Sequence, residues 1–263
     1  MKIIVCIKQT PDTSEMKFDP ESKTIIREGV ENIVNPFDLY AIEEALRIKE
    51  EDPDTEITAI SMGPGSAENA LREVVSMGVD NAILISDKAF AAADTLATSY
   101  TLAKAIEKIG EYDLIMFGKQ AIDGDTAQVG PGVAQWLGIP QITFIRKIEE
   151  INAGRIRAER ATEAGYEVIE TAMPCALTCI KELNEPRLPS LRGKIKAKKI
   201  EIPRWNAEDI EADTDMIGFK GSPTWVVKAF TPTIEKETII YGDDDQEKNV
   251  DMLIEALKGK NIL

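Results

Sequence analysis

The sequence predicts an α/β protein built on a doubly wound parallel sheet. Short, continuously apolar segments alternate with amphipathic segments as far as Pro140, which is typical of strands joined by crossover helices. Continuous apolar strands are expected where helices cover both faces of a sheet. Beyond Pro140 the pattern changes to strand-like runs joined by short turns. These runs predict an antiparallel extension of the sheet, followed by an extended C-terminal arm.

Each segment that predicts a parallel strand is followed by a helical pattern. The predicted strands are residues 2–8, 56–63, 81–87 and 113–119, and the predicted helices are residues 35–51, 66–78, 95–110 and 126–138. The first helix starts with Asn35 as a candidate N-cap and Pro36 at the first helical position, where proline is favoured. Gly78 and Gly110 are suited to end the second and third helices.

The antiparallel extension is predicted from four further strand-like runs, at residues 141–151, 155–162, 166–173 and 175–180. From about residue 185 the apolar density falls and prolines become frequent. We therefore expect an α/β domain at 1–184 and an extended arm at 185–263. An amphipathic helix near the end of this arm, at 247–260, is expected to dock on a partner.

The composition argues against several classes of protein. The 263 residues include no histidine, which removes Ser/His and Cys/His nucleophilic sites and the commonest zinc sites. A formal net charge of −15 opposes binding to nucleic acid. No apolar run approaches the roughly 20 residues of a membrane span, and no signal-peptide pattern opens the chain. With three cysteines and no CxxC pair, we expect reduced thiols in a cytoplasmic protein.

The candidate binding site lies in the loops that follow the four parallel strands, because ligands of open α/β sheets bind beyond the carboxyl ends of the strands. The fourth loop, at 118–132, is rich in glycine and polar residues. Asp123 and Asp125 could accept hydrogen bonds from ribose hydroxyls, and Thr126 with nearby backbone N–H groups could hold pyrophosphate. The alternative is a turn with an Asp or Thr cap, which leaves the four glycines and Gln128 unexplained.

The second and third loops give weaker indications. Gly63 and Gly65 precede a helix, which suits either a phosphate or an ordinary turn. Asp94 and Thr95 are equally consistent with a helix cap and with a nucleotide contact. The dinucleotide fingerprint and the Walker pattern are both absent from the sequence.

Four blocks of the sequence carry a family resemblance. They are VCIKQTPD at 5–12, VNPFDLYAIEEALRIKE at 34–50, GKQAIDGDTAQVGP at 118–131 and RATEAGYEVIETAMPCAL at 160–177. Together they resemble the beta subunit of electron transfer flavoproteins along nearly the whole chain. The resemblance implies that the doubly wound sheet is of the adenine-nucleotide-binding type and that the domain at 1–184 binds a nucleotide. The last block follows the family's signature at Arg160, Glu163, Gly165, Glu167, Ile169 and Pro174. Glu159 and Ala164 depart from it.

The resemblance implies a heterodimer in which the alpha subunit carries an electron-transferring FAD and the beta subunit holds AMP or a second FAD. The loop IDGDTAQVGP and the NPFD motif resemble members that bifurcate electrons from NADH, and this favours FAD. The residues that the resemblance places against the cofactor are Cys6, Asp38, Met62, Asp123, Gly124, Asp125, Thr126, Gln128, Val129 and Gly130. Those that would face NADH are Gly63, Gly65, Asp94 and Thr95.

The same resemblance implies how the electrons move. NADH would give a hydride to the beta-subunit flavin, and the electrons would then part singly. One would pass to the alpha-subunit flavin and an acyl-CoA or other flavin dehydrogenase, the other to ferredoxin or flavodoxin. The flavin performs this chemistry, so the resemblance assigns no catalytic side chain.

A partner-recognition segment is also implied by the resemblance, at residues 184–199. Leu191 takes the anchor position, and the lysines around it would steer the chain toward an acidic surface.

Two alternatives stay open. One is a conventional beta subunit with structural AMP, and the other is a stand-alone adenine-nucleotide-binding enzyme or sensor. A phosphate loop rich in glycine and basic residues would favour the second alternative.

Overall fold

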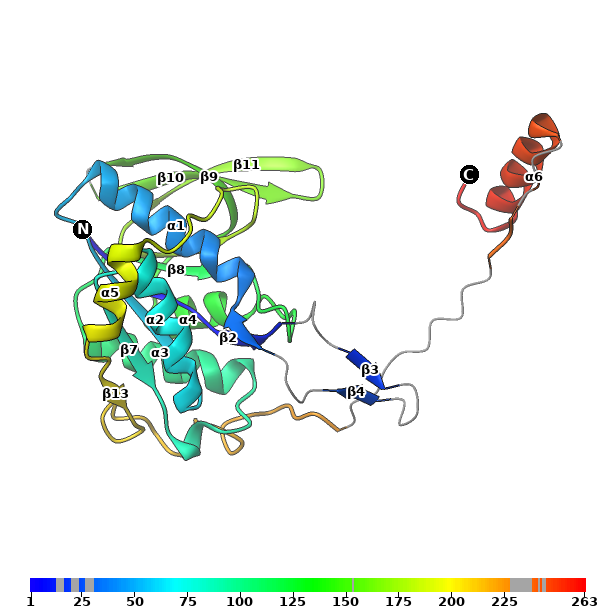
Figure 1. The fold of residues 1–263 in the computed structure, drawn as a ribbon. Helices are drawn as coiled ribbons and strands as arrows, with labels where there is room; N and C mark the ends of the chain where they lie inside the picture. The colour runs from blue at the N-terminus through cyan, green and yellow to red at the C-terminus, as the bar shows by residue number, and fades with distance from the viewer. Residues whose placement is uncertain are drawn as a thin grey trace. The chain divides into compact units, whose positions relative to one another are not determined.

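The computed structural model describes residues 1–12, 17–19, 24–26, 31–152, 154–227, 238–240, 242 and 245–263. The chain divides into two compact units, Met1–Lys228 and Ala229–Leu263. The first unit holds a nine-stranded sheet in the order β11-β10-β9-β12-β8-β1-β6-β7-β13, with helices on both faces (Figure 1). The fold class predicted from the sequence is therefore confirmed.

The four predicted parallel strands form the centre of the sheet. They are β1 (Lys2–Cys6), β6 (Glu56–Met62), β7 (Asn81–Ile85) and β8 (Leu114–Gly118). β1 pairs in parallel with both β6 and β8, with Val5 opposite Ala59 on one side and Met116 on the other. Because all four strands run the same way, their carboxyl ends meet at one edge, and the loops that follow them gather there.

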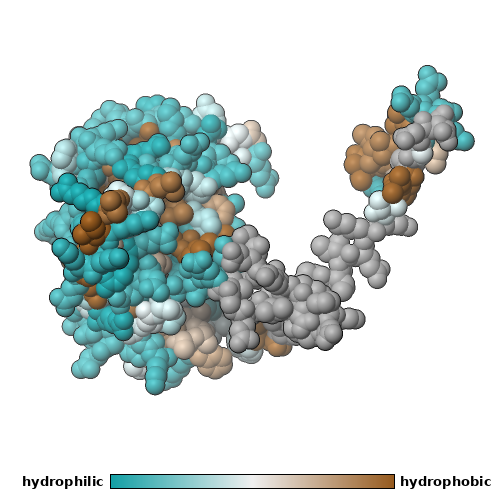
Figure 2. All heavy atoms as spheres, viewed as in Figure 1, coloured by the Kyte–Doolittle hydropathy of each residue, from teal (hydrophilic) through white to brown (hydrophobic). Residues whose placement is uncertain are grey.

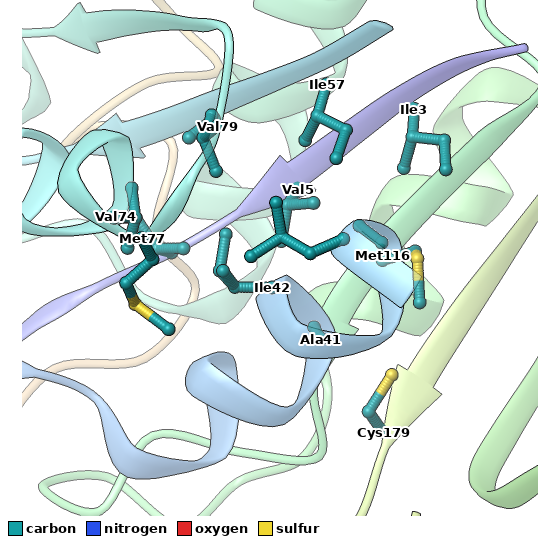
Figure 3. Close-up of a cluster of buried hydrophobic side chains, with 14 of the residues drawn as sticks. Ile3, Val5, Ala41, Ile42, Ile57, Val74, Met77, Val79, Met116 and Cys179 are labelled. Atoms are coloured by element: carbon teal, nitrogen blue, oxygen red, sulfur yellow. The ribbon is translucent and has the colours of Figure 1, made fainter. Parts of the chain in front are cut away.

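Helices cover the two faces of the sheet in pairs. α1 (Pro36–Glu51) and α2 (Glu68–Met77), which the 3₁₀ turn η2 (Gly65–Ala67) precedes, pack on one face. α3 (Thr95–Ile109), preceded by η3 (Lys88–Phe90), and α4 (Val129–Leu137) pack on the other. Figure 3 shows the first of these cores, in which Ile42 of α1 and Val74 of α2 lie beside Val5 of β1. All three of these side chains are completely buried, so the first core is a dry apolar layer.

One part of the predicted antiparallel extension is wrong. β9 (Gln141–Asn152), β10 (Arg155–Thr162) and β11 (Gly165–Ala172) form the expected antiparallel meander. β12 (Cys175–Cys179), however, lies between β8 and β9 and is parallel to both. All five of its residues are buried, as expected of a central strand covered on both faces.

The segment after residue 185 also differs from the prediction, because it forms a helix rather than an extended basic arm. α5 spans Leu191–Lys199, and Ser190 caps it by accepting a hydrogen bond from the Gly193 N–H at 2.9 Å. The helix packs so closely on α2 that a Cβ added at Gly193 would collide with the Ser76 carbonyl group. β13 (Arg204–Trp205) then adds to the sheet in parallel beside β7. Residues 191–205 therefore belong to the body of the first unit.

The other described elements are two short antiparallel strand pairs and the final helix. β2 (Gln9–Pro11) pairs antiparallel with β5 (Asn32–Val34), and β3 (Lys17–Asp19) with β4 (Thr24–Ile26). In the second unit, α6 (Gln246–Gly259) confirms the predicted C-terminal helix. Among the described residues, no helix has the length and the apolar character that a membrane span would need.

The close packing of α5 on α2 can be tested at Gly193. We expect Gly193→Ala to lower the free energy of unfolding by about 1–3 kcal/mol, because the added methyl group must push α5 away from α2. Gly259→Ala is the matched control, since a Cβ there meets no atom within 4 Å and alanine favours a helix. Urea unfolding followed by circular dichroism measures both variants. Equal stability of the two would contradict the close contact.

Candidate functional site

The loops at the carboxyl edge of the sheet are tied to one another by side chains. Lys8, just after β1, places its Nζ atom 2.7 Å from both carboxylate oxygens of Asp123, in the loop after β8. Gln9 exchanges two hydrogen bonds with Ser66, in the turn η2 before α2: Gln9 Nε2 donates to the Ser66 carbonyl at 2.9 Å, and Ser66 Oγ donates to Gln9 Oε1 at 3.0 Å. The loop after β1 is thus joined to the loops on either side of it.

Asn35 holds the loop after β8 from beneath. Its side-chain Nδ2 donates to Asp38 Oδ1 and to the Gln120 carbonyl, both at 2.9 Å, and its Oδ1 accepts from the Ile122 N–H at 3.1 Å. Asn35 occupies the N-cap position of α1, but its side chain makes no capping bond to the helix. The sequence therefore predicts the position of this residue correctly and its hydrogen-bond partners wrongly.

Asp38 completes the same buried cluster. Its carboxylate accepts from the Lys8 N–H at 2.7 Å and from the Gly118 N–H at 3.2 Å, in addition to Asn35. A Cβ at Gly118 would lie 2.7 Å from the Asp38 nitrogen, so only glycine permits this approach of α1 to β8. Burial raises the pKa of Asp38 from 3.8 to about 7, although the three hydrogen bonds act to lower it. The predicted cofactor contact at Asp38 is therefore a buried carboxyl group whose two oxygens are held by donors of the protein.

Above this cluster, the loop after β8 presents its polar residues to solvent. Asp123, Gly124, Asp125, Thr126 and Gln128 are all exposed. Gln120 Nε2 donates to Asp125 Oδ1 at 2.7 Å, and Asp125 itself has a φ of 50°. Left-handed backbone at a non-glycine residue is uncommon, and it is often found at functional sites. The structure thus brings the five exposed residues of the strongest predicted loop into one surface.

Three of the four glycines in this loop are explained by close packing rather than by ligand binding. A Cβ at Gly130 would lie 2.8 Å from Thr178 Cγ2, and one at Gly132 would lie 2.8 Å from Ser99 Cβ. These two glycines, like Gly118, permit close packing. Gly124 differs, because a Cβ there would meet nothing within 4 Å. Open space beside the exposed loop is therefore found at Gly124.

Two of the predicted cofactor contacts lie at strand ends within the core. Cys6 is 5% exposed, packs with the apolar residues beneath α3 and α4, and has a thiol pKa raised by burial and by the nearby Asp38. Met62 is half-buried against the same apolar cluster. Val129 is likewise half-buried against it, in the first turn of α4. Packing accounts for all three side chains.

Asp94 acts as the cap of α3. Its Oδ1 atom accepts from the N–H groups of Leu96 and Ala97 at 2.9 and 3.1 Å. Its Oδ2 atom accepts from the Thr224 backbone N–H at 3.0 Å and from the Thr224 hydroxyl at 2.7 Å. Partial burial alone would raise the pKa of Asp94, but the bonds from Thr224 and from the helix backbone outweigh it and lower the pKa. By sequence, Asp94 is consistent with a helix cap and with a nucleotide contact, and the structure shows the helix cap.

α4 begins differently from α3. Gln128 stands at its N-cap position and makes no side-chain capping bond. Instead, Gln128 Oε1 accepts a hydrogen bond from the Thr95 hydroxyl at 2.9 Å, which joins the starts of the two helices. The first backbone N–H groups of α4 thus have no side-chain cap, and such groups are suited to bind anions.

The glycine turn after β6 lies beside a cation that the sequence argument missed. A Cβ at Gly63 would lie 3.1 Å from Ala67 Cβ, whereas one at Gly65 would lie 3.7 Å from Arg204 Nη1. The guanidinium group of Arg204 is half-exposed and pairs with Glu68 at 2.6 Å. Arg204 is distant in sequence and enters through β13, so no local pattern could have indicated it.

Comparison with known proteins agrees with the family resemblance. The sequence matches the electron transfer flavoprotein domain family over residues 22–210. Proteins named electron transfer flavoprotein subunit beta are 50% identical in Thermoanaerobacterium thermosaccharolyticum and 47% identical in Megasphaera elsdenii. The caffeyl-CoA reductase-Etf complex subunit CarD of Acetobacterium woodii is 46% identical. All three matches cover 100% of this chain and 100% of the relative.

The buried carboxyl group of Asp38 predicts a pH-dependent stability. Because its folded pKa is about 7, the folded chain keeps a proton that the unfolded chain releases above about pH 4. The free energy of unfolding that Asp38 contributes should therefore fall as the pH rises from about 4 to about 7, by on the order of 1 kcal/mol per pH unit. Asn does not titrate, so urea unfolding of the wild type and of Asp38→Asn at several pH values measures this term. A difference between the two proteins that stays constant over this range would contradict it.

Proposed function

The chain belongs to the beta-subunit family of electron transfer flavoproteins, and from this premise we propose that its carboxyl-edge loops hold FAD, whose flavin accepts a hydride from NADH. An electron-transfer role follows from the family match and from relatives that match over their full length. The observation that carries the finer proposal is the exposed loop from Asp123 to Gln128, with open space at Gly124 and an uncapped helix beneath it.

The residues of this loop fit the adenosine diphosphate part of FAD. Asp123 and Asp125 offer carboxylate oxygens to ribose hydroxyls, and each keeps acceptor capacity beyond its bond to Lys8 or Gln120. The first N–H groups of α4 and the Thr126 hydroxyl suit the phosphates. Since the cluster of Asn35 and Asp38 holds the loop from beneath, these groups are already arranged before a ligand binds.

The chain's side chains would position the cofactor rather than react. When bound, FAD supplies hydride acceptance and single-electron transfer, which no amino-acid side chain provides. Lys8 ties the loop after β8 to the end of β1 through its ion pair with Asp123. Gly63 and Gly65 leave backbone accessible for NADH on the neighbouring loop, while Asp94 and Thr95 keep the starts of α3 and α4 together.

FAD is favoured over AMP by sequence features of the loop and of the first helix. The motifs IDGDTAQVGP and NPFD resemble those of bifurcating members. A conventional subunit would place AMP in the same loop, because AMP shares the adenosine and a phosphate with FAD. The two cofactors thus share the contacts of the adenosine and of one phosphate, and FAD adds the flavin part with its redox chemistry.

Partners are proposed from the exposed apolar side chains. In the second unit, α6 exposes Val250 and Leu253 on one face, and we assign this face to the alpha subunit. Leu191 is 79% exposed and serves as the anchor for an acyl-CoA or other flavin dehydrogenase. The relative named as part of a caffeyl-CoA reductase complex supports a partner that acts on an acyl-CoA. Ferredoxin or flavodoxin is the proposed acceptor of the low-potential electron.

The proposal is tested by mixing NADH anaerobically with the heterodimer of this chain and its alpha subunit, and following the visible absorbance of flavin. We expect NADH to bleach the wild type. Gly124→Val should slow the bleaching by about tenfold or more, because the side chain fills the space beside the loop and displaces the cofactor. Gly242→Val is the control, since its Cβ also meets nothing within 4 Å and it belongs to the second unit rather than to the loop after β8.

Two results would count against this function. If NADH does not bleach the wild-type heterodimer, the conventional subunit with AMP is favoured. If Gly124→Val bleaches as fast as the wild type, the flavin that reacts with NADH does not lie in this loop.

A further inference from the structure

Arg187 joins the segment after β12 to the middle of α1 through a two-carboxylate clamp. Its Nε and Nη2 atoms donate to the two oxygens of Glu43 at 2.7 and 3.0 Å, and its Nη1 atom donates to Glu50 at 2.6 Å. The backbone N–H of Arg187 also donates to Glu43, at 3.0 Å. This bidentate geometry is the strongest form of an arginine–carboxylate pair.

The clamp is largely removed from solvent at its Glu43 end. Glu43 is 4% exposed. Burial acts to raise the pKa of Glu43, but the hydrogen bonds from Arg187 and Arg47 outweigh it and lower the pKa. Loss of Arg187 would leave a buried carboxylate without its main partner, so this contact is expected to hold firmly.

Both ends of the same segment are fixed as well. Asn184 Nδ2 donates to the Tyr40 carbonyl at 3.0 Å and to Glu44 at 2.9 Å, both on α1. At the other end, the Ser190 N–H donates to the Ser76 carbonyl of α2 at 3.3 Å. Residues 184–190 are therefore held at three points, and the segment is a rigid mount rather than the loose arm that the prolines suggest.

This mount presents an apolar ridge. Leu188, Leu191 and Ile195 are 88%, 79% and 51% exposed. Leu191 and Ile195, four residues apart, lie on one side of α5, and Leu188 stands three residues before this helix begins. In Figure 2, brown atoms lie over the region of α5 among teal ones. We call Leu188, Leu191 and Ile195 the apolar ridge.

Cations surround the apolar ridge. Arg192, Lys194, Lys198 and Lys199 take part in no ion pair within the described part of the chain. A basic rim around an apolar centre is complementary to an apolar pocket with an acidic rim. It is also an exception on a chain whose formal net charge is −15, which favours a partner of opposite sign at this place.

α1 connects this mount to the candidate cofactor site. The helix starts at the buried cluster of Asn35 and Asp38, and Glu43 follows Asp38 after five residues, roughly 8 Å along the axis. The same rigid element thus sets the position of the exposed loop above Asn35 and that of the segment held by Arg187.

We propose that Arg187 is a positioning residue: its clamp on Glu43 and Glu50 holds the apolar ridge, Leu188 and Ile195 as well as Leu191, in place for docking to a flavin dehydrogenase. This inference rests on the proposed function for the identity of the partner. A ridge that is ordered before binding loses less conformational entropy on docking. Removal of the clamp should therefore weaken docking while the cofactor site stays intact.

The test uses the heterodimer, with a butyryl-CoA dehydrogenase, butyryl-CoA as electron donor and a redox dye as terminal electron acceptor, and measures the KM for the dehydrogenase. Arg187→Gln is expected to raise this KM by about tenfold, with kcat and flavin content unchanged. Arg187→Lys keeps the charge but loses the bidentate pair with Glu43, and it should restore only part of the affinity. Arg192→Gln removes the same charge from the rim without breaking the clamp, and should raise KM by only about twofold.

Two further measurements test the ridge and the clamp separately. Leu188→Ala cannot disturb packing at an 88% exposed side chain, and it should raise the KM as Arg187→Gln does. Amide hydrogen exchange of residues 184–191 should become faster in Arg187→Gln and stay unchanged in Arg192→Gln.

The outcomes separate this inference from the function on which it rests. A wild-type heterodimer that exchanges no electrons with the dehydrogenase overturns the proposed partner class. With an active wild type, equal KM values for Arg187→Gln and Arg192→Gln overturn the positioning role. Loss of flavin or of the alpha subunit from Arg187→Gln also overturns it, because the segment would then serve the cofactor site or the subunit interface.

Discussion

The hydrogen bonds of the buried pair Asn35 and Asp38 are the constraint on which the carboxyl edge of this protein depends. The two residues are 1% and 5% exposed, and buried polar groups of this kind are costly unless they are bonded. Their partners come from three places, the end of β1, the end of β8 and the loop beyond it. Removing any one partner would leave a polar group buried and unsatisfied. The start of α1 is therefore fixed against the sheet, and the exposed loop is fixed above it.

Two surfaces with proposed functions follow from this one constraint. Above the pair, the loop can expose a run of polar residues and adopt left-handed backbone at Asp125, because its ends are held from below. Along α1, Glu43 and Glu50 face the segment after β12 and hold it through Arg187. The loop proposed to hold the cofactor and the apolar ridge proposed for a partner are thus both held in place by the same helix.

Local sequence patterns predict the α/β fold but miss what depends on distant contacts. Hydrophobic periodicity and helix caps locate the four parallel strands and the helices between them, because these signals are local. The parallel placement of β12 depends on its neighbours β8 and β9, and the docking of α5 depends on a glycine facing Ser76. The site follows the same division. The exposed loop is predicted from its composition, because composition is local. The hydrogen bonds of Asn35, the packing of Gly130 and the position of Arg204 beside Gly65 are set by tertiary structure.

The central claim is that this chain holds FAD in the loop above Asn35. The most direct measurement is to denature the purified heterodimer in acid and quantify the released FAD and AMP by chromatography. The account predicts FAD from both subunits, hence twice as much FAD as heterodimer, and no AMP. Equal amounts of FAD and AMP would contradict it, because the chain would then be a conventional electron carrier with a structural nucleotide.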